Sequence, residues 1–458
     1  MKATMKPLAA ATLLLALGAP LALAKVSPEE AARLGGPELT PMGAERAGNA
    51  DGTIPEWTGS MVGAPDGVKY DTGTVHPNPY AGEKPLFVIT AQNMGQYADK
   101  LTDGQKALFG NYPDTFKMPV YPSHRDGGLA PRIYENIKKN ALSAELESDG
   151  NGVLNAYGAA PFPIPKSGIE VLWNHNLHYS AFREYAFYTG AAVYPNGQIA
   201  YDKVEYDIAS FYNDPQLGRT NFDGLQASFM VNQLAPARQK GEILLGHTFI
   251  NPKQEPSQIW QYIPGTRRVR RAPNVAYDTP QGAGGLRGVD EDRLFNGSPD
   301  RFDWKLLGKK EIYIPYNAYA LDDPSLKYED LLTVGHINSD HTRYELHRVW
   351  VIEGTLREGA RHIYNKRRLY IDEDSWAAVL ADNYDARGEL WRTAMQHFIY
   401  AYDLEGFHAR VAVYHDLISG MYSAQRLINE EEQMPIVNTG RREDNFYTAA
   451  NLRKMGNR

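Results

Sequence analysis

The 458-residue sequence contains no cysteine, and this absence removes several classes of function at once. Without thiols the chain forms no disulfide, no thiolate metal site and no iron–sulfur cluster, and it offers no cysteine nucleophile. It also lacks the cysteine that a lipid-anchored lipoprotein needs for acylation. Excess positive charge is missing too, because the formal net charge is −7. We therefore expect no nucleic-acid partner, since phosphate binding needs a positive field.

A long hydrophobic run occurs only near the first residue. Lys2 and Lys6 precede an apolar stretch from Leu8 to Leu17, and Ala22-Leu23-Ala24 fits a signal-peptide cleavage site. The stretch is shorter than the ~20 residues that span a bilayer, although an uncleaved anchor is the alternative. We predict a signal peptide over residues 1–24, cleavage after Ala24, and a periplasmic mature chain with no transmembrane segment.

Common catalytic and ligand-binding motifs are absent, including the zinc-protease, nucleophile-elbow and phosphate-loop patterns. The glycine-rich run 282–288 does not follow a strand pattern, so we expect a mobile loop rather than a dinucleotide site. Segments 49–54 and 147–152 resemble the middle of calcium loops, but Thr58 and Gly158 stand where a bidentate glutamate is needed. Turns explain both segments, and we predict no cofactor and no metal.

Three histidines lie close together in the sequence. His336, His341 and His347 are near Asp340 and Glu345, which makes a zinc site or a His/Asp hydrolytic site conceivable. The alternative is a set of surface and hydrogen-bonding histidines, and we favour it.

Two basic runs occur, at 267–271 and 366–368. In a strand, alternation places Arg268 and Arg270 on one face and Arg267 on the other. Solvated strand edges are the expected explanation for both runs, with docking to an acidic partner or to lipid headgroups as the alternative.

The first third of the chain favours short helices and irregular structure. Ser27-Pro28-Glu29-Glu30 is typical of a helix start. We predict helices from Thr90 to about Leu101 and from Pro131 to about Glu147, the second with Ile133, Ile137 and Leu142 on one side. The three prolines of 159–165 exclude helix there, and we place the boundary of the amino-terminal region, residues 25–165, at this point.

After residue 166 apolar and polar residues alternate with period two, which indicates a large, strongly curved antiparallel sheet and an α+β fold. Asn196-Gly197 favours a tight hairpin turn between two strands. Only Gly224 to about Gln239 reads as a helix in this second region, residues 166–458. The predicted strands are 183–194, 198–207, 242–250, 258–263, 267–271, 311–315, 343–356, 363–371, 377–384, 390–402, 410–414 and 421–427.

Two segments resemble LolA- and LolB-type lipoprotein carriers. Residues 259–269, Ile-Trp-Gln-Tyr-Ile-Pro-Gly-Thr-Arg-Arg-Val, are similar to a hairpin of these carriers. Residues 369–376 followed by 382–391 resemble their next pair of strands, with an Ile-Asp pair before an aromatic residue and a Tyr-Asp-x-x-Gly-x-Leu-Trp run.

A longer resemblance covers nearly the whole mature chain. The chain is similar to a proteobacterial family of unknown function, domain of unknown function 1329, whose members are often described as outer membrane lipoprotein-sorting proteins. The resemblance implies a half-open antiparallel barrel wrapped on helices, a periplasmic location and, often, a genomic neighbour among exporters of large hydrophobic molecules. It supplies no catalytic residue. The segments that carry it are 48–57, 78–85, 120–125, 161–165 with 173–175, and 302–311.

We expect a non-catalytic periplasmic carrier or chaperone that shelters a lipid or another hydrophobic molecule in a curved sheet. An inner-membrane exporter and an outer-membrane acceptor are expected partners, and the long amino-terminal segment is expected to plug or cover the barrel. The alternatives are a structural adaptor of an envelope exporter and a lipid ester hydrolase that uses the His336–His347 region. The residues predicted to line the cavity are Trp260, Tyr262, Tyr384, Trp391, Phe398 and Tyr400.

Overall fold

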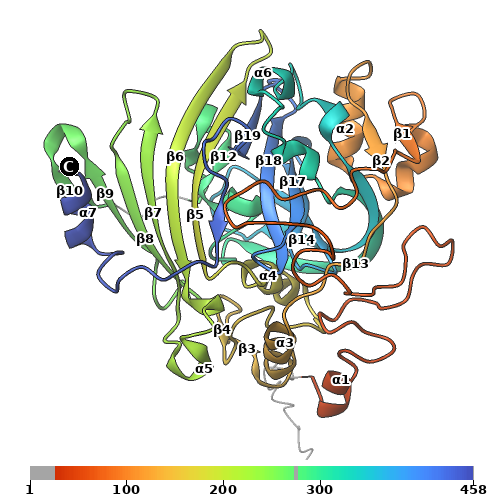
Figure 1. Cartoon of the computed structure of the whole chain (residues 1–458), viewed down its shortest axis with the longest axis horizontal. Helices are drawn as coiled ribbons and strands as arrows, with labels where there is room; N and C mark the ends of the chain where they lie inside the picture. The colour runs from red at the N-terminus through yellow and green to blue at the C-terminus, as the bar shows by residue number, and fades with distance from the viewer. Residues whose placement is uncertain (1–25, 273–276, 457–458) are drawn as a thin grey trace, which may run out of the picture.

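One large curved antiparallel sheet dominates the computed structural model, which describes residues 26–272 and 277–456 (Figure 1). The predicted signal peptide, residues 1–24, lies outside the described residues. The 16-stranded sheet follows the order β1-β2-β14-β15-β16-β17-β18-β19-β5-β6-β7-β8-β9-β10, with β13 paired to β14 and β20 to β5. The sheet does not close on itself. This confirms the predicted α+β fold with a half-open barrel.

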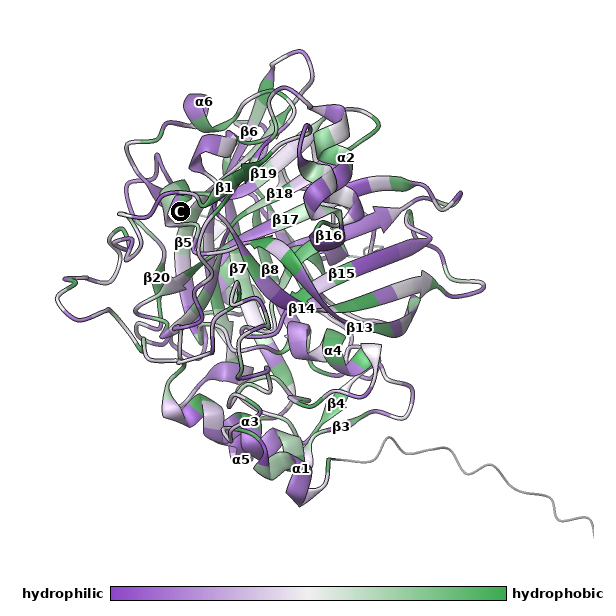
Figure 2. Cartoon of the chain, turned by 90° about the vertical axis from the view of Figure 1, so that its right-hand side faces the viewer, coloured by the Kyte–Doolittle hydropathy of each residue, from purple (hydrophilic) through white to green (hydrophobic). Residues whose placement is uncertain are grey.

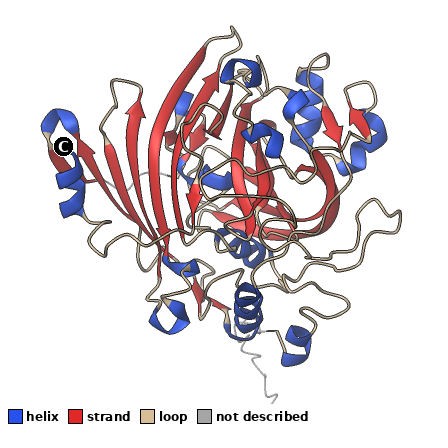
Figure 3. Ribbon diagram, viewed as in Figure 1, coloured by secondary structure: helices blue, strands red, loops and turns tan. Residues whose placement is uncertain are grey.

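Helices are few and short, and they lie around the sheet (Figure 3). The α- and 3₁₀-helices are α1 Pro28–Ala32, η1 Met94–Lys100, α2 Asp103–Asn111, α3 Pro131–Ser143, α4 Gly168–Asn176, η2 Phe211–Asn213, α5 Gly218–Asn221, η3 Pro264–Thr266, η4 Ala283–Gly285, η5 Val289–Leu294, η6 Tyr319–Asp322, α6 Tyr328–Leu331, η7 Ser339–His341 and α7 Ala449–Gly456. The strands are β1 Phe87–Ile89, β2 Met118–Val120, β3 Glu145–Leu146, β4 Val153–Leu154, β5 Arg183–Val193, β6 Ile199–Ser210, β7 Leu225–Ala235, β8 Ile243–Phe249, β9 Gln258–Ile263, β10 Arg268–Arg271, β11 Pro280–Gln281, β12 Arg287–Gly288, β13 Phe302–Pro315, β14 Tyr344–Leu356, β15 Lys366–Asp372, β16 Ala378–Tyr384, β17 Leu390–Ala401, β18 Gly406–Asp416, β19 Tyr422–Leu427 and β20 Ile436–Val437.

The β5–β6 hairpin forms where the sequence predicts it. Arg183 pairs with Ala209 at the open end and Val193 with Ile199 next to the turn. Gly197 has φ +81°, a conformation that glycine adopts without steric cost, which explains why Asn-Gly is favoured in this turn.

The predicted helix from Gly224 to Gln239 is wrong, because this segment forms strand β7. Its Leu225 and Phe229 have the spacing of a helix face, but Phe229-Met230-Val231 is equally suited to a strand. β7 pairs with β6 on one side and with β8 on the other, so the two neighbours take up its backbone hydrogen bonds. Tertiary pairing therefore overrides the local pattern.

The amino-terminal helices are partly as predicted. Ser27 and Glu30 form the predicted capping box at the start of α1. The helix predicted from Thr90 to Leu101 is confirmed in part, as the 3₁₀-helix η1 over 94–100 with Asn93 rather than Thr90 at its N-cap. Helix α2 follows it, and the side chain of Thr102 caps α2 by accepting from the amide of Gln105. Helix α3 ends at Ser143, and although Ile133 and Ile137 are buried as predicted, Leu142 is 44% exposed.

The two faces of the sheet are covered by different elements. One face, here called the α4 face, carries Ile352, Leu369 and Ala381, which pack in one core with Val171 and Leu172 of α4. A second core joins Leu108 and Phe109 of α2 to other residues of β14–β17. Strands β14–β17 therefore carry buried side chains on both faces.

The two basic runs lie in different surroundings. β10 is an edge strand and Arg268 and Arg270 are exposed, as predicted. The prediction that the second run is solvated is wrong for Arg367 of β15, whose side chain is 0% exposed. The strand is nevertheless rich in hydrophilic residues, as its purple colour in Figure 2 shows. Arg367 is buried because β15 lies between β14 and β16 and because its guanidinium has an internal partner, Asp290, at 2.7 Å.

The division at residue 165 stays a prediction. Strands β1 and β2 come from the amino-terminal region yet belong to the same sheet as the later strands. No helix among the described residues is both long enough and apolar enough to span a membrane.

Candidate functional site

The strands β6–β10 form one end of the sheet, here called the wing (Figure 1). The α4 face of the wing carries a row of apolar side chains. The register of the sheet shows which side chains of the wing lie on the α4 face. Directly paired residues on neighbouring strands share a face, and the pairs lead from β14 to β6 through Ile352, Leu369, Ala381, Ala394, Tyr414, Ser423, Ala192 and Ala200. Side chains alternate along a strand, so the even-numbered residues of β6 lie on this face. The row continues through Tyr206, Val231 and Leu244 in one register and Ile208, Phe229 and Ile259 in the next.

All six side chains of the row are half-buried. They differ in this from Ile352, Leu369, Ala381 and Ala394 on the α4 face of β14–β17, which are 0–2% exposed in the core that contains α4. A row of neighbouring apolar side chains that retains solvent contact is a surface that a hydrophobic ligand can cover.

Two exposed arginines border the row. Arg270 pairs with Gln261, which pairs with Leu244, so Arg270 lies on the α4 face, and Arg268 lies on the same face two residues away. Neither guanidinium forms an ion pair with another described residue. The apolar row therefore ends in two unneutralised positive charges.

The opposite face of the wing is covered by α7. Met230, Ile243, Leu245 and Tyr262 pack with Leu452 of α7 in one core. This face is therefore covered by the chain itself, whereas the six side chains of the row on the α4 face keep solvent contact.

The six aromatic residues predicted to line a cavity lie in several places. Trp260 and Tyr262 belong to the α7 face of the wing, where Tyr262 is only 1% exposed. Tyr384 donates a hydrogen bond to Asp103 at the start of α2, at 2.6 Å.

The other three are equally separate. Trp391 donates through Nε1 to Asp416 at 3.0 Å, Phe398 packs in the core that contains α2, and Tyr400 donates to the carbonyl of Gly128 at 2.7 Å. Their role in ligand binding stays a prediction.

Two hollows in the described part of the chain are not lined by these six residues. The first, of about 20 Å³, lies between α3 and residues 161–164. The second, of about 270 Å³, lies between η1–α2 and β13–β15 and has a largely polar lining that includes Asp103, Lys106 and Arg368. The polar lining does not suit an acyl chain.

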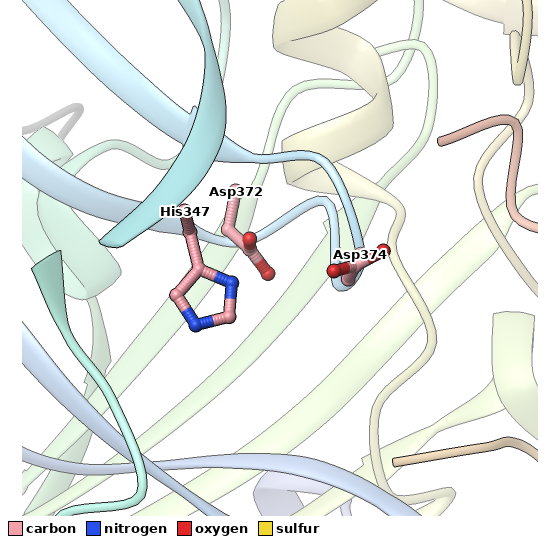
Figure 4. A group of neighbouring side chains, drawn as sticks. All are labelled: His347, Asp372 and Asp374. Atoms are coloured by element: carbon pink, nitrogen blue, oxygen red, sulfur yellow. The ribbon is translucent and has the colours of Figure 1, made fainter. Parts of the chain in front are cut away.

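The three clustered histidines do not meet in one site. His336 contacts Thr115 Oγ1 at 3.0 Å, and burial lowers its pKa. His341 lies at the end of η7, half-buried, and His347 is buried in β14 with Nε2 3.2 Å from Glu345 Oε2. Among the described residues, His347 instead forms a group with Asp372 and Asp374 (Figure 4).

A buried network of charges surrounds this group. Arg125 donates to both oxygens of Asp374, at 2.7 and 2.8 Å, and to the carbonyl of Glu45 at 2.7 Å. Lys309 donates to Glu373 at 2.7 Å. The arrangement binds the amino-terminal region to the turn after β15, and Asp374 and Glu373 each have a positive charge as a partner.

The two calcium-like segments and the glycine-rich run have structural roles. Asn49 accepts from the amide of Ile54 and Asp149 from the amide of Asn151, which is turn chemistry, as predicted. The run 282–288 joins β11 to β12 and packs against β5 and β6. Its mobility stays a prediction.

The family follows from the sequence as a whole. A family model described as protein of unknown function (DUF1329) matches residues 88–453. The chain belongs to this family. The predicted membership is thereby confirmed, and the DUF1329 chain is also 47% identical over 465 aligned positions to the uncharacterized protein PA3922 of Pseudomonas aeruginosa, with 100% of both chains covered.

Solved structures similar to this DUF1329 chain are more distant. A DUF1329 family protein from Desulfovibrio piger is 14% identical, with 60% of this chain and 92% of that chain covered and a TM-score of 0.39. A putative outer membrane lipoprotein-sorting protein domain from Vibrio parahaemolyticus is 13% identical, with 59% and 91% covered and a TM-score of 0.39. The LolA superfamily protein NE2245 from Nitrosomonas europaea is 13% identical, with 62% and 99% covered and a TM-score of 0.35.

Sequence reasoning missed the apolar row and the carboxylate group. Phe229 and Val231 lie in the segment for which the sequence predicts a helix, so their place on one face of a strand was not predicted. Asp372 stands in the Ile-Asp pair that carries the LolA-type resemblance, so the signal was present, but nothing in the sequence connects it to His347.

Proposed function

We propose that this DUF1329 protein is a periplasmic, non-catalytic carrier or chaperone that shelters a lipid on the α4 face of the wing. The observation that carries the proposal is the row of half-buried apolar side chains across β6–β9, which ends at Arg268 and Arg270. The signal-peptide pattern of residues 1–24 supports the location.

The two parts of the surface suit the two parts of an anionic lipid. Each CH₂ that leaves water gains ~0.8 kcal/mol, so an acyl chain laid along the row gains several kcal/mol. The exposed guanidiniums supply hydrogen-bond donors and charge for a phosphate headgroup. The proposed cargo is therefore a lipid with an anionic headgroup.

Two measurements test this. Lipids extracted from the natively purified full chain are identified by mass spectrometry, and delipidated protein is titrated with pyrene-labelled phosphatidylglycerol. We expect near one-to-one binding that the double variant Leu244→Gln with Ile259→Gln weakens at least tenfold. The matched control, Leu142→Gln with Ile418→Gln, removes exposed apolar side chains elsewhere on the molecule and should bind normally.

The headgroup is tested separately. Arg268→Gln with Arg270→Gln should weaken binding of labelled phosphatidylglycerol and leave binding of the zwitterionic phosphatidylcholine probe unchanged. Protein that carries no lipid and binds neither probe overturns the carrier and favours the structural adaptor. Equal binding by the wing variant and its control overturns the proposed surface.

A further inference from the structure

Four carboxylates lie together in the buried network, and three of them have cationic partners. Asp374 is paired with Arg125, Glu373 with Lys309, and Glu345 with Arg343. Asp372 has no ion pair with any described arginine or lysine, and it is 0% exposed.

The hydrogen bonding of Asp372 is also incomplete. Ser375 donates to its Oδ2 at 2.6 Å, but Oδ1 has no partner among the described residues. A buried carboxylate of this kind costs free energy unless it is protonated or meets a cation.

His347 is oriented toward this carboxylate. Figure 4 shows one ring nitrogen of His347 directed to Asp372, and one ligand atom from each of His347, Asp372 and Asp374 lies within 4.8 Å of the other two. The other ring nitrogen, Nε2, lies 3.2 Å from Glu345 Oε2. A carboxylate at Nε2 favours the tautomer that carries the proton there, and this tautomer leaves the Nδ1 lone pair for a cation, as in metal-binding histidines.

Tyr316 gives an independent observation. Its ring stacks on the His347 ring with centroids 4.0 Å apart, it is 3% exposed, and its hydroxyl has no described hydrogen-bond partner. An unsatisfied buried hydroxyl and an unsatisfied buried carboxylate oxygen thus occur at one place.

We propose that His347, Asp372 and Asp374 bind one divalent cation of the Zn²⁺ class. One imidazole and two carboxylates suit a borderline cation better than Ca²⁺ or Mg²⁺, which prefer oxygen ligands alone. Asp374 retains lone pairs for the cation besides those that accept from Arg125. The cation supplies the missing positive partner of Asp372.

The site is structural in character. All three ligands are buried, so the cation enters as the chain folds, and the fourth position that three protein ligands leave is available to a water molecule. It joins β14 to the turn between β15 and β16, where Arg125 already attaches the amino-terminal region.

The test uses the natively purified full chain, without a metal-affinity tag. Metal content is measured by inductively coupled plasma mass spectrometry. The protein is then unfolded in urea that contains EDTA, freed of EDTA, and refolded with or without ZnCl₂. We expect close to one equivalent of metal and a higher urea midpoint after refolding with ZnCl₂. The absence of metal in purified protein, together with no effect of ZnCl₂ on refolding, overturns the proposal whether or not any variant folds.

Variants locate the site. Asp372→Asn should abolish both the bound metal and the ZnCl₂-dependent shift. His336→Gln, a change to another buried histidine, should leave both intact. Metal that persists in Asp372→Asn places the cation elsewhere and overturns the assignment. These outcomes are independent of lipid binding.

Discussion

Arg367 provides a sharp test of how the sheet is held together. Its guanidinium is 0% exposed and donates to Asp290 at 2.7 Å, to Asn383 at 3.2 Å and to the carbonyl of Leu294 at 3.1 Å. Burial alone would raise the pKa of Asp290, but Arg367 and His362 outweigh it and hold that pKa below its ordinary value.

The substitution Arg367→Met keeps a flexible, unbranched apolar stem and removes the guanidinium with its charge. Asp290 is then left buried, with only His362 nearby at 3.2 Å. Breaking one partner of a buried pair costs about 3–5 kcal/mol, a large part of the 5–15 kcal/mol by which a folded domain is typically stable. We expect this loss in the free energy of unfolding, measured by urea titration with tryptophan fluorescence.

The adjacent residue is the matched control. Arg368 pairs with Glu353 at 2.7 Å, but its side chain keeps 24% exposure, so Arg368→Met should cost about 1 kcal/mol or less. The double variant Arg367→Met with Asp290→Asn should recover part of the loss, because it removes the unpaired charge. Equal losses in Arg367→Met and Arg368→Met would refute the reasoning.

Two further changes probe the contact between α2 and the sheet. Gly104→Ala should destabilise by about 1–3 kcal/mol, because an added Cβ would lie 2.0 Å from Thr393 Oγ1; Gly95→Ala, whose Cβ meets nothing within 4 Å, is the control in the same urea titration. Burial raises the pKa of Asp382 from 3.8 to about 6, so the folded state binds this proton more tightly and stability is lost as pH rises between these values. Asp382→Asn should therefore gain stability relative to wild type from pH 4 to pH 6, by up to about 3 kcal/mol, and a pH-independent difference would contradict this.

Much of the fold could be predicted because its signals are local. The hairpin of β5 and β6 follows from period-two alternation and from Asn196-Gly197, and both are visible in a few consecutive residues. β7 could not be predicted in this way, because Leu225 and Phe229 fit a helix as well as a strand and the decision comes from β6 and β8. The burial of Arg367 could not be predicted for a related reason. Alternation along a strand indicates which face a side chain lies on, but not whether other elements cover that face.

The candidate sites depend on distant segments and were harder to predict. The apolar row needs the register of β6, β7, β8 and β9 together. The carboxylate group needs β14 and the turn after β15 in contact, with Arg125 supplied from the amino-terminal region. No local sequence pattern predicts such a contact, although the Ile371-Asp372 pair belongs to the motif that resembles LolA-type carriers.

The amino-terminal region attaches to both halves of the sheet. Its Tyr70 donates to Asp403 after β17, and Arg125 bonds to the turn after β15, both on the β14–β18 half. Its Asp149 forms an ion pair with Lys253, which follows β8 next to the wing. The β14–β18 half is buried on both faces, whereas the apolar row on the wing keeps solvent contact. Loss of the metal cluster should therefore destabilise the protein without removing the wing surface, and the role of this region as a cover for the ligand stays a prediction.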